Sequence, residues 1–243
     1  MGQIMNVIVC DSYEDMSKKA AELTAQMLET KPNGLVSFPG GDTPAGMVKD
    51  FVSMVNDGIV DISHANFTML DEWVGLSVKD EGSCAKFVQD NLIDQLEKPF
   101  AHIHMVDGSD NPENQIAALD HFIESYGPLS VSVLGIGLNG HLGFNESGVS
   151  PNKNAHMIPL DDVTKNVMHK YFPEDVNPEY GLTQGLNQIL QAEMVILIAN
   201  GAHKAEIIKK AVSGEVTTSV PASILQRHTN CYVVVDQEAA KLL

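Results

Sequence analysis

The sequence predicts an α/β protein with a single domain, in which a doubly wound, mostly parallel sheet carries helices on both faces. Short runs that are apolar throughout alternate along the chain with longer segments of helical spacing. Strands covered on both faces have this continuous apolar character. The chain has 243 residues, of which 44% are hydrophobic, so it can bury one sizeable core. Neither an internal repeat nor a linker divides residues 1–243, which indicates one domain.

The predicted strands and helices follow one another along the whole chain. Strands are expected at residues 5–9, 35–38, 67–70, 131–136, 194–199 and 232–235. Helices are expected at residues 13–28, 44–55, 113–126 and 203–212. Strands that alternate with helices in this way favour a parallel sheet. Ligands of such sheets bind beyond the carboxyl ends of the strands, so the loops after the strands are candidate sites.

The acidic composition limits the partners of the protein. The net charge of −17 argues against nucleic acid and anionic membrane surfaces. A small anionic ligand is compatible with it, if a few placed cations and backbone amides hold the anion. No apolar run approaches the roughly 20 residues that span a bilayer. Cys10, Cys84 and Cys231 show no paired spacing, so we expect reduced thiols and a cytoplasmic location.

A glycine-rich segment, FPGGDTPAG, occupies residues 38–46 between a predicted strand and a predicted helix. Gly40 and Gly41 allow the backbone to turn its N–H groups toward an anion, which the dipole of the following helix also favours. We expect Thr43 to be the N-cap and Pro44 the first helical residue. A tight turn without a ligand explains this segment equally well. It is not a P-loop, because no Gly-Lys-Ser/Thr follows.

Two adjacent acids follow the next predicted strand, where residues 69–76 read MLDEWVGL. Neighbouring side chains on an extended segment point in opposite directions. We therefore expect Asp71 to face a ligand and Glu72 to be structural or to pair with a nearby group. A solvated acidic turn is equally consistent with this segment taken alone.

Residues 133–148 read VLGIGLNGHLGFNESG, with four glycines ahead of the Phe-Asn-Glu triplet. Glycines at these positions suggest positive φ angles or a close approach of the backbone. His141 and Glu146 can pair within this loop, and such pairing suits an imidazole for general acid–base catalysis. Asn139 and Asn145 offer amides that position hydroxyl groups or the imidazole. A histidine that only satisfies loop carbonyls is the alternative. No metal site is predicted, because the histidines lack ligand spacing.

Two lysines are candidates for binding an anion as point charges. Lys204 follows the predicted strand at residues 194–199 and lies near the start of a helix, which is the better position. Lys170 lies in the sequence MHKYF at residues 168–172. Each would be a solvated surface residue by default.

Taken in order, these motifs resemble the glucosamine 6-phosphate deaminase (isomerase) family. GGDTP at residues 40–44 is similar to the phosphate loop of that family, and DEWVGL at residues 71–76 to its Asp-Glu-Tyr-Val-Gly-Leu segment. NGHLGFNE at residues 139–146 is similar to its catalytic loop. Residues 181–192 and 201–205 also fit. The resemblance extends over essentially the whole chain, so it is more specific than any single motif.

The resemblance implies a cytoplasmic enzyme that converts an amino-sugar 6-phosphate to a ketohexose 6-phosphate and ammonia, without a metal or an organic cofactor. It assigns Asp71 as the base that moves a proton between C2 and C1, and His141 with Glu146 and Asn139 to ring opening. The position of Asn139 holds Asp in some members of the family and Asn in others. The implied phosphate-binding residues are Gly40, Gly41, Asp42, Thr43, Lys204 and Lys170. Lys170 stands where the glucosamine enzymes commonly have an arginine.

Three departures from the family pattern point to its galactosamine 6-phosphate branch. Trp73 replaces a Tyr, GSC at residues 82–84 replaces Glu-Ser-Tyr, and VPAS at residues 220–223 replaces a segment like Trp-Thr-Ile-Ser. The two substrates differ only at the C4 hydroxyl, and polar groups placed for one epimer are left unpaired with the other. We therefore expect galactosamine 6-phosphate to be preferred, with glucosamine 6-phosphate a close second.

Two other functions remain open at this point. A 6-phosphogluconolactonase shares the fold, but its loop typically reads Asp-Gly-His-Thr-Ala-Ser-Leu-Phe-Pro, whereas Leu-Gly-Phe-Asn-Glu follows His141 here. A non-catalytic sugar-phosphate sensor shares the architecture and normally carries a helix-turn-helix segment, for which we expect no room ahead of the first strand. A homo-oligomer is compatible with the sequence.

Overall fold

The computed structural model describes residues 5–168, 171–172 and 176–243. In this part of the chain, seven strands form one sheet in which every neighbouring pair is parallel. In spatial order, the strands are β1 (Asn6–Cys10), β10 (Cys231–Asp236), β9 (Met194–Ala199), β6 (Leu129–Leu134), β2 (Leu35–Phe38), β3 (Asn66–Met69) and β5 (His102–His104). The prediction of a mostly parallel sheet is confirmed.

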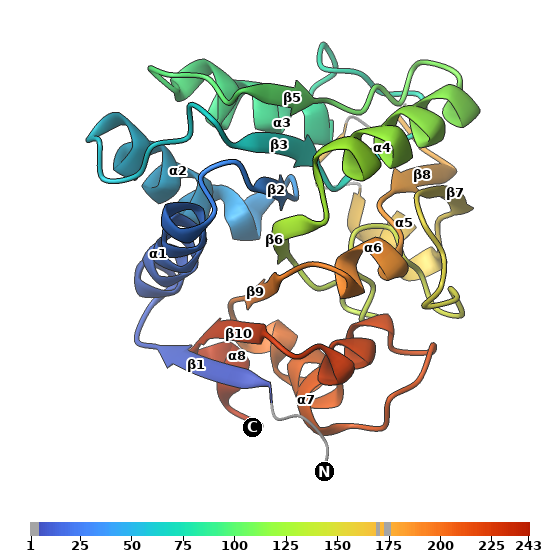
Figure 1. Ribbon diagram of the computed structural model, residues 1–243. Coiled ribbons are helices and arrows are strands. Elements are labelled where there is room, and N and C mark those ends of the chain that lie inside the picture. Colours follow the sequence, from blue (N-terminus) through green and yellow to red (C-terminus); the bar gives the residue numbers. More distant parts are fainter. Residues whose placement is uncertain (1–4, 169–170, 173–175) are drawn as a thin grey trace.

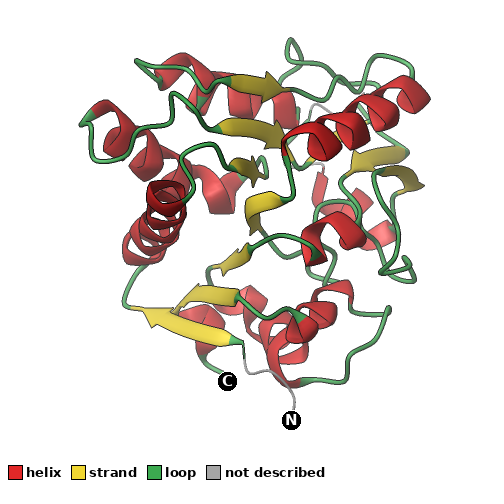
Figure 2. Cartoon of the chain, viewed as in Figure 1, coloured by secondary structure: helices red, strands yellow, loops and turns green. Residues whose placement is uncertain are grey.

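Helices connect the strands and cover both faces of the sheet, as Figure 2 shows. α1 and α2 lie on one side of it, and α4 and α6 lie on the other (Figure 1). The α-helices are α1 (Tyr13–Thr30), α2 (Asp42–Asn56), α3 (Cys84–Asn91), α4 (Pro112–Tyr126), α5 (Asp162–Met168), α6 (Leu186–Leu190), α7 (Ala205–Ser213) and α8 (Gln237–Ala240). Short 3-10 turns occur at Ile93–Gln95, Ala202–Lys204 and Pro221–Arg227. The doubly wound arrangement that the sequence predicts is therefore present.

The core lies along the middle strands of the sheet. Every residue of β2, β3, β6 and β9 is buried, because helices cover both faces of these strands. The ring of Phe38 at the end of β2 packs edge-on against Phe51 of α2 and Phe67 of β3, with centroids 5.4 and 5.6 Å apart. Such dense packing fixes the strand ends, and therefore the loops that leave them. No helix among the described residues combines the length and apolar character needed to cross a membrane.

A second sheet, which the sequence analysis did not predict, lies beside the ends of the main strands. It contains β4 (Asp71–Trp73), β8 (Tyr180–Thr183) and β7 (His156–Pro159), all paired antiparallel. The ring of Trp73 packs against Phe144 and Phe172, with centroids 4.6 and 5.3 Å apart. This satellite core holds the small sheet against the loop that follows β6.

Candidate active site

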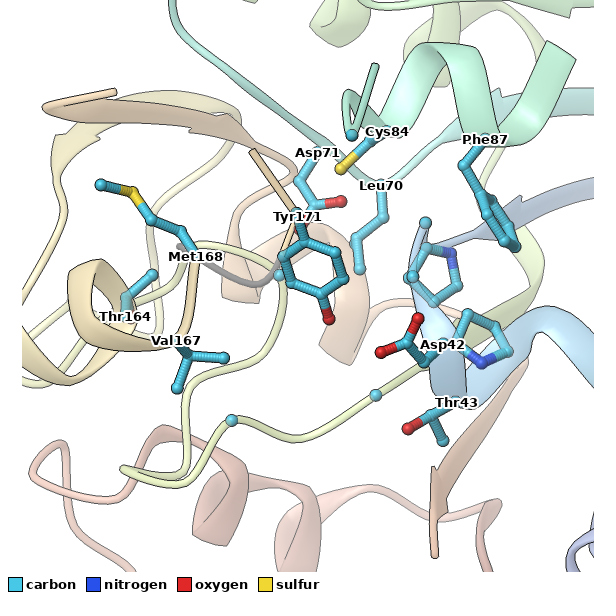
Figure 3. A pocket seen from close by; sticks show the side chains of 18 of the residues that line it. Asp42, Thr43, Leu70, Asp71, Cys84, Phe87, Thr164, Val167, Met168 and Tyr171 are labelled. Atoms are coloured by element: carbon cyan, nitrogen blue, oxygen red, sulfur yellow. The ribbon is translucent and has the colours of Figure 1, made fainter. Parts of the chain in front are cut away.

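A pocket of about 650 Å³ lies at the carboxyl ends of four neighbouring strands (Figure 3). Its walls include residues 39–44 after β2, Leu70 and Asp71 after β3, residues 135–138 after β6, and Asn200 after β9. Side chains of α3 and α5 complete the wall. This is the crevice in which ligands of doubly wound sheets bind.

One end of the pocket is formed by the start of α2. This helix begins at Asp42 with Gly41 as its N-cap, and the φ angle of Gly41 is 114°, which suits only glycine. The expected N-cap at Thr43 and helix start at Pro44 are therefore wrong, because Gly41 turns the chain two residues earlier. Thr43 instead donates its hydroxyl to Asn200 Oδ1 at 3.2 Å, which ties α2 to the end of β9. The first-turn N–H groups of α2 lack helical partners, so they can bind an anion.

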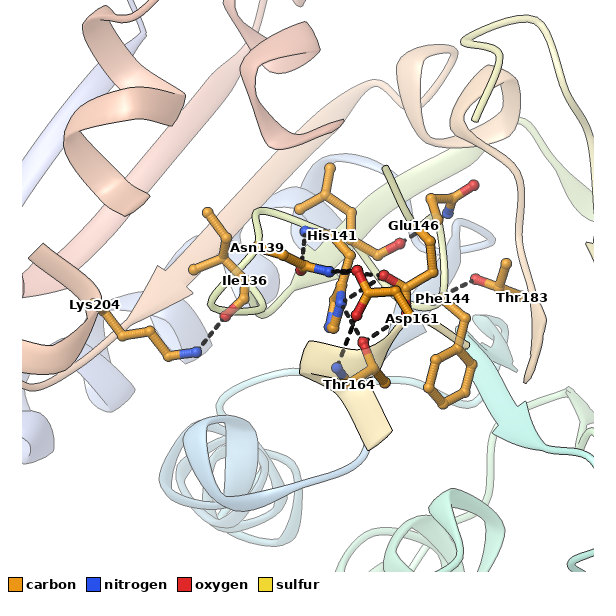
Figure 4. Close-up of polar contacts among 11 residues, drawn as sticks. Ile136, Asn139, His141, Phe144, Glu146, Asp161, Thr164, Thr183 and Lys204 are labelled. Carbon is orange, nitrogen blue, oxygen red and sulfur yellow. Dashed lines mark hydrogen bonds and ion pairs between the residues drawn. The ribbon is translucent and has the colours of Figure 1, made fainter. Parts of the chain in front are cut away.

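Lys204 lies at the same end of the pocket. Its Nζ donates to the carbonyl oxygen of Ile136 at 2.5 Å, which holds the ammonium group beside the loop after β6 (Figure 4). Asp42 also lines this end, and because its carboxylate would repel a phosphate, its backbone N–H is the group suited to an anion. Lys170, the second lysine of the sequence analysis, lies outside the described residues.

Asp71 and Glu72 point in opposite directions from β4, as alternation along a strand requires. Asp71 faces the pocket (Figure 3). Glu72 is fully buried and accepts the backbone N–H groups of Trp73, Cys84 and Ala85 at 2.8, 3.0 and 2.6 Å. Burial raises the pKa of Glu72 to about 8, while these hydrogen bonds favour its charged form. Glu72 thus anchors the start of α3 next to β4.

The Asp71 carboxyl group lies in a dry environment with two polar neighbours. Burial raises the pKa of Asp71 to about 7, although the nearby His141 and a hydrogen bond from the Cys84 thiol favour the charged form. A carboxylate whose pKa lies near neutral pH can act as a general base, because it is both ionised and appreciably basic there. Cys84 lies in the first turn of α3. The hydrogen bonds that hold this turn to Glu72 therefore also place the Cys84 thiol next to the Asp71 carboxyl group.

His141 belongs to a hydrogen-bonded network on the loop after β6 (Figure 4). Its Nδ1 lies 3.3 Å from Glu146 Oε2 and 3.1 Å from the Thr164 hydroxyl. The Thr164 hydroxyl donates to Glu146 Oε1 at 2.6 Å, and Asn139 Nδ2 donates to Glu146 Oε2 at 2.9 Å. These contacts favour the tautomer with a proton on Nδ1, so Nε2 is the atom available for exchange with a ligand. His141 lines the pocket, whereas Glu146 is buried behind it.

Glycines allow this loop to approach its neighbours closely. A Cβ on Gly137 would lie 2.4 Å from His141 Nε2, so the imidazole occupies the space that a side chain would fill. Gly143 has a φ of 56°, and a Cβ there would lie 3.3 Å from Asp71 Oδ2. At Gly135, by contrast, a Cβ would meet nothing within 4 Å. The loop thus brings His141 and Asp71 to one pocket through Gly137 and Gly143.

Asn145 does not face the pocket, contrary to the interpretation that its amide positions a hydroxyl group or the imidazole. It is fully buried, and its Nδ2 donates to the carbonyl oxygens of Leu142 and Gln184 at 2.8 Å each. These hydrogen bonds fix the loop after β6 against the end of β8. Asn145 therefore supports the loop from behind.

Three polar residues of the site were missed by the sequence analysis. Cys84 appeared only as a reduced thiol and a family departure, and Asp161 and Thr164 at the start of α5 were not considered. Their only local signal is an Asp followed three residues later by a Thr, which is too common to indicate a site. The fold brings α5 beside the loop after β6. Among the described residues, no three His, Cys, Asp or Glu side chains are grouped so that they could hold a metal ion.

Fold and site together define a doubly wound α/β protein in which a helix N-terminus, a lysine, an aspartate and a histidine line one crevice at the strand ends. Residues 11–234 match the family model of glucosamine-6-phosphate isomerases/6-phosphogluconolactonases. The chain belongs to this family.

Individual relatives refine the comparison. The glucosamine-6-phosphate deaminase of Thermoanaerobacter pseudethanolicus is 36% identical over 242 residues, covering 98% of this chain and 95% of the relative. That of Clostridium perfringens strain 13 is 36% identical over 241 residues, covering 98% and 100%. The solved structure of a monomeric glucosamine-6-phosphate deaminase has a TM-score of 0.93 at 31% identity, covering 98% and 100% of the two chains. The 6-phosphogluconolactonase of Trypanosoma brucei has a TM-score of 0.77 at 17% identity, covering 98% of each chain, and shares the fold alone.

Proposed function

We propose that this protein is a hexosamine 6-phosphate deaminase, which hydrolyses an amino-sugar 6-phosphate to a ketohexose 6-phosphate and ammonia. The observation that carries the proposal is the placement of two acid–base groups in one pocket. Asp71, whose pKa burial raises to about 7, shares the pocket with His141, which a buried carboxylate orients. The names of the relatives at 36% identity support the same reaction class.

The substrate phosphate would bind at the start of α2. The N–H groups of Gly41, Asp42 and Thr43 and the ammonium group of Lys204 are at this end of the pocket. A helix N-terminus and one cation together bind a phosphate well. This placement leaves the sugar ring extending toward Asp71 and His141. Gly40 and Lys170 complete the predicted phosphate set, Lys170 from outside the described residues.

Ring opening is assigned to His141. The C1 hydroxyl of the pyranose loses its proton and the ring oxygen O5 gains one, so the C1–O5 bond breaks and an open-chain aldehyde forms. His141 Nε2 can carry this proton, because Glu146 and Thr164 hold Nδ1. Asn139 holds Glu146 in turn. The aldehyde then makes the proton on C2 acidic.

Isomerisation is assigned to Asp71. The ionised carboxylate takes the C2 proton while the aldehyde oxygen O1 takes a proton from the ammonium group of the substrate, giving a neutral enolamine with a hydroxyl group on C1. The carboxyl group then returns its proton to C1, giving an iminium at C2. Water adds to the iminium carbon, ammonia leaves, and the C2 carbonyl of the ketohexose 6-phosphate remains. Burial favours this chemistry, because it makes Asp71 a stronger base than an exposed carboxylate.

The preferred epimer remains a prediction from the sequence. Trp73 and Cys84, two of the family departures, both line the pocket next to Asp71. They support a preference for galactosamine 6-phosphate, whereas the relatives described above are named for the glucosamine epimer. Both substrates therefore belong in the decisive experiment.

The test is ammonia release from each hexosamine 6-phosphate, followed by identification of the ketohexose 6-phosphate. Equal molar amounts of ammonia and ketose are expected from at least one epimer. The same sugars without the phosphate are the control and should react far more slowly. No ammonia from either phosphate, or hydrolysis of 6-phosphogluconolactone instead, would reject the proposal.

A further inference from the structure

Asp161 joins the catalytic loop to α5 without reaching the pocket. One carboxylate oxygen, Oδ1, accepts the backbone N–H of Thr164 at 2.9 Å, which caps the start of α5. The other, Oδ2, accepts a short hydrogen bond from Asn139 Nδ2 (Figure 4). Asp161 does not line the pocket, so it is placed to act on the reaction only through other residues.

The amide of Asn139 is oriented by what surrounds it. Its Nδ2 faces two carboxyl groups, those of Asp161 and Glu146, and its Oδ1 accepts the backbone N–H of His141 at 3.1 Å. A reversed amide would place an oxygen against two carboxyl groups and an N–H against an N–H. Asp161 thus adds a second acceptor that favours the Asn139 orientation in which the amide contacts both His141 and Glu146.

Asp161 remains charged in this position. Burial alone would raise its pKa, but hydrogen bonds from the Thr164 backbone and Asn139, together with the nearby His141, favour the charged form, and the pKa is lowered. The Asn139 amide therefore faces a charged acceptor in Asp161.

We propose that Asp161 is a positioning residue for the deaminase reaction: its carboxylate fixes the Asn139 amide and thereby the tautomer and orientation of His141. This inference rests on the proposed function for its kinetic readout.

Asp161→Asn is the primary variant, because asparagine caps a helix as well as aspartate does and α5 should therefore survive. We expect kcat to fall about 10- to 100-fold through misplacement of His141, with KM within about twofold. Asp162→Asn changes the exposed neighbouring acid and should leave both constants unchanged. Asn139→Asp alone would gather three carboxyl groups and should also lower kcat.

The exchange variant Asn139→Asp/Asp161→Asn separates positioning from capping. The carboxyl group that it introduces at position 139 faces one other carboxyl group, that of Glu146, in place of the two that it faces in Asn139→Asp, so we expect its kcat to exceed that of Asn139→Asp at least about tenfold. Losses that simply multiply in the exchange variant would overturn the proposal. So would wild-type kcat in Asp161→Asn, or a fall in its melting temperature that accounts for the loss of activity.

A readout without substrate keeps this test separate from that of the proposed function. The ¹⁵N resonances of His141 in the ligand-free protein should show one neutral tautomer, with the proton on Nδ1, and a mixture of tautomers in Asp161→Asn. Identical resonances in the two proteins would overturn the positioning role. If the wild-type protein releases no ammonia, the proposed function fails, while this spectroscopic result still decides whether Asp161 orients His141.

Discussion

Replacing Asp71 by asparagine should stabilise the protein at alkaline pH while it removes activity. Burial raises the pKa of Asp71 from 3.8 to about 7, so the folded state holds this proton more tightly than the unfolded chain does. The stability contributed by the neutral carboxyl is fully present below about pH 4 and is lost as the pH rises through about 7. The difference between the two pKa values corresponds to a loss of about 4 kcal/mol in the free energy of unfolding when Asp71 ionises. Asparagine does not ionise, so the Asp71→Asn protein does not lose this stability.

The assay is urea unfolding at pH 5 and pH 8 in buffers without phosphate. Between these pH values, the free energy of unfolding of Asp71→Asn should gain about 2 to 3 kcal/mol relative to the wild-type protein. Glu124→Gln, which changes an exposed acid of α4, is the matched control and should show no such gain. Equal pH dependence in Asp71→Asn and wild type would refute the reasoning, because Asp71 would then titrate alike in the folded and unfolded chains.

Three further predictions concern activity. The kcat/KM of the wild-type protein should fall tenfold per pH unit below about pH 7, because Asp71 must be ionised; a flat profile from pH 5 to 8 would contradict this. Gly137→Ala should lower kcat about 100-fold, because its Cβ would displace the imidazole 2.4 Å away; a kcat within about twofold of the wild-type value would remove the steric argument. Lys204→Ala should raise the KM for the phosphate substrate about 10- to 100-fold, because one charged hydrogen bond to the phosphate is lost. Lys209→Ala, which changes an exposed lysine, should leave the KM unchanged. An unchanged KM in Lys204→Ala would show that Lys204 does not bind the phosphate.

The four middle strands of the main sheet could be predicted because they are buried on both faces. The edge strand β5 has only three residues, none of them fully buried, and it was not predicted. The runs at β6 and β9 are apolar or nearly so along their length, and no competing helical pattern overlaps them. The small sheet could not be predicted in the same way. β4 has only three residues, two of them acidic, and its pairing with β8 depends on contacts more than 100 residues away in the sequence. A local pattern carries no information about such a pairing.

The site residues also differ in whether local sequence or distant contacts determine their positions. Alternation along the chain predicted the opposite directions of Asp71 and Glu72, because it needs only local geometry. The start of α2 was misplaced, since the positive φ of Gly41 ends the turn before Thr43 can cap the helix. Asp161 was missed altogether, because its partner Asn139 lies 22 residues earlier and meets it only in the folded chain.

The most direct test of the central claim is the rate of ammonia release by Asp71→Asn at pH 8, on whichever epimer the wild-type protein prefers. The substitution keeps the shape of the side chain and removes the base, so the rate should fall by about 10²- to 10⁴-fold, with the substrate still bound. A rate within about tenfold of the wild-type value would show that another group moves the C2 proton.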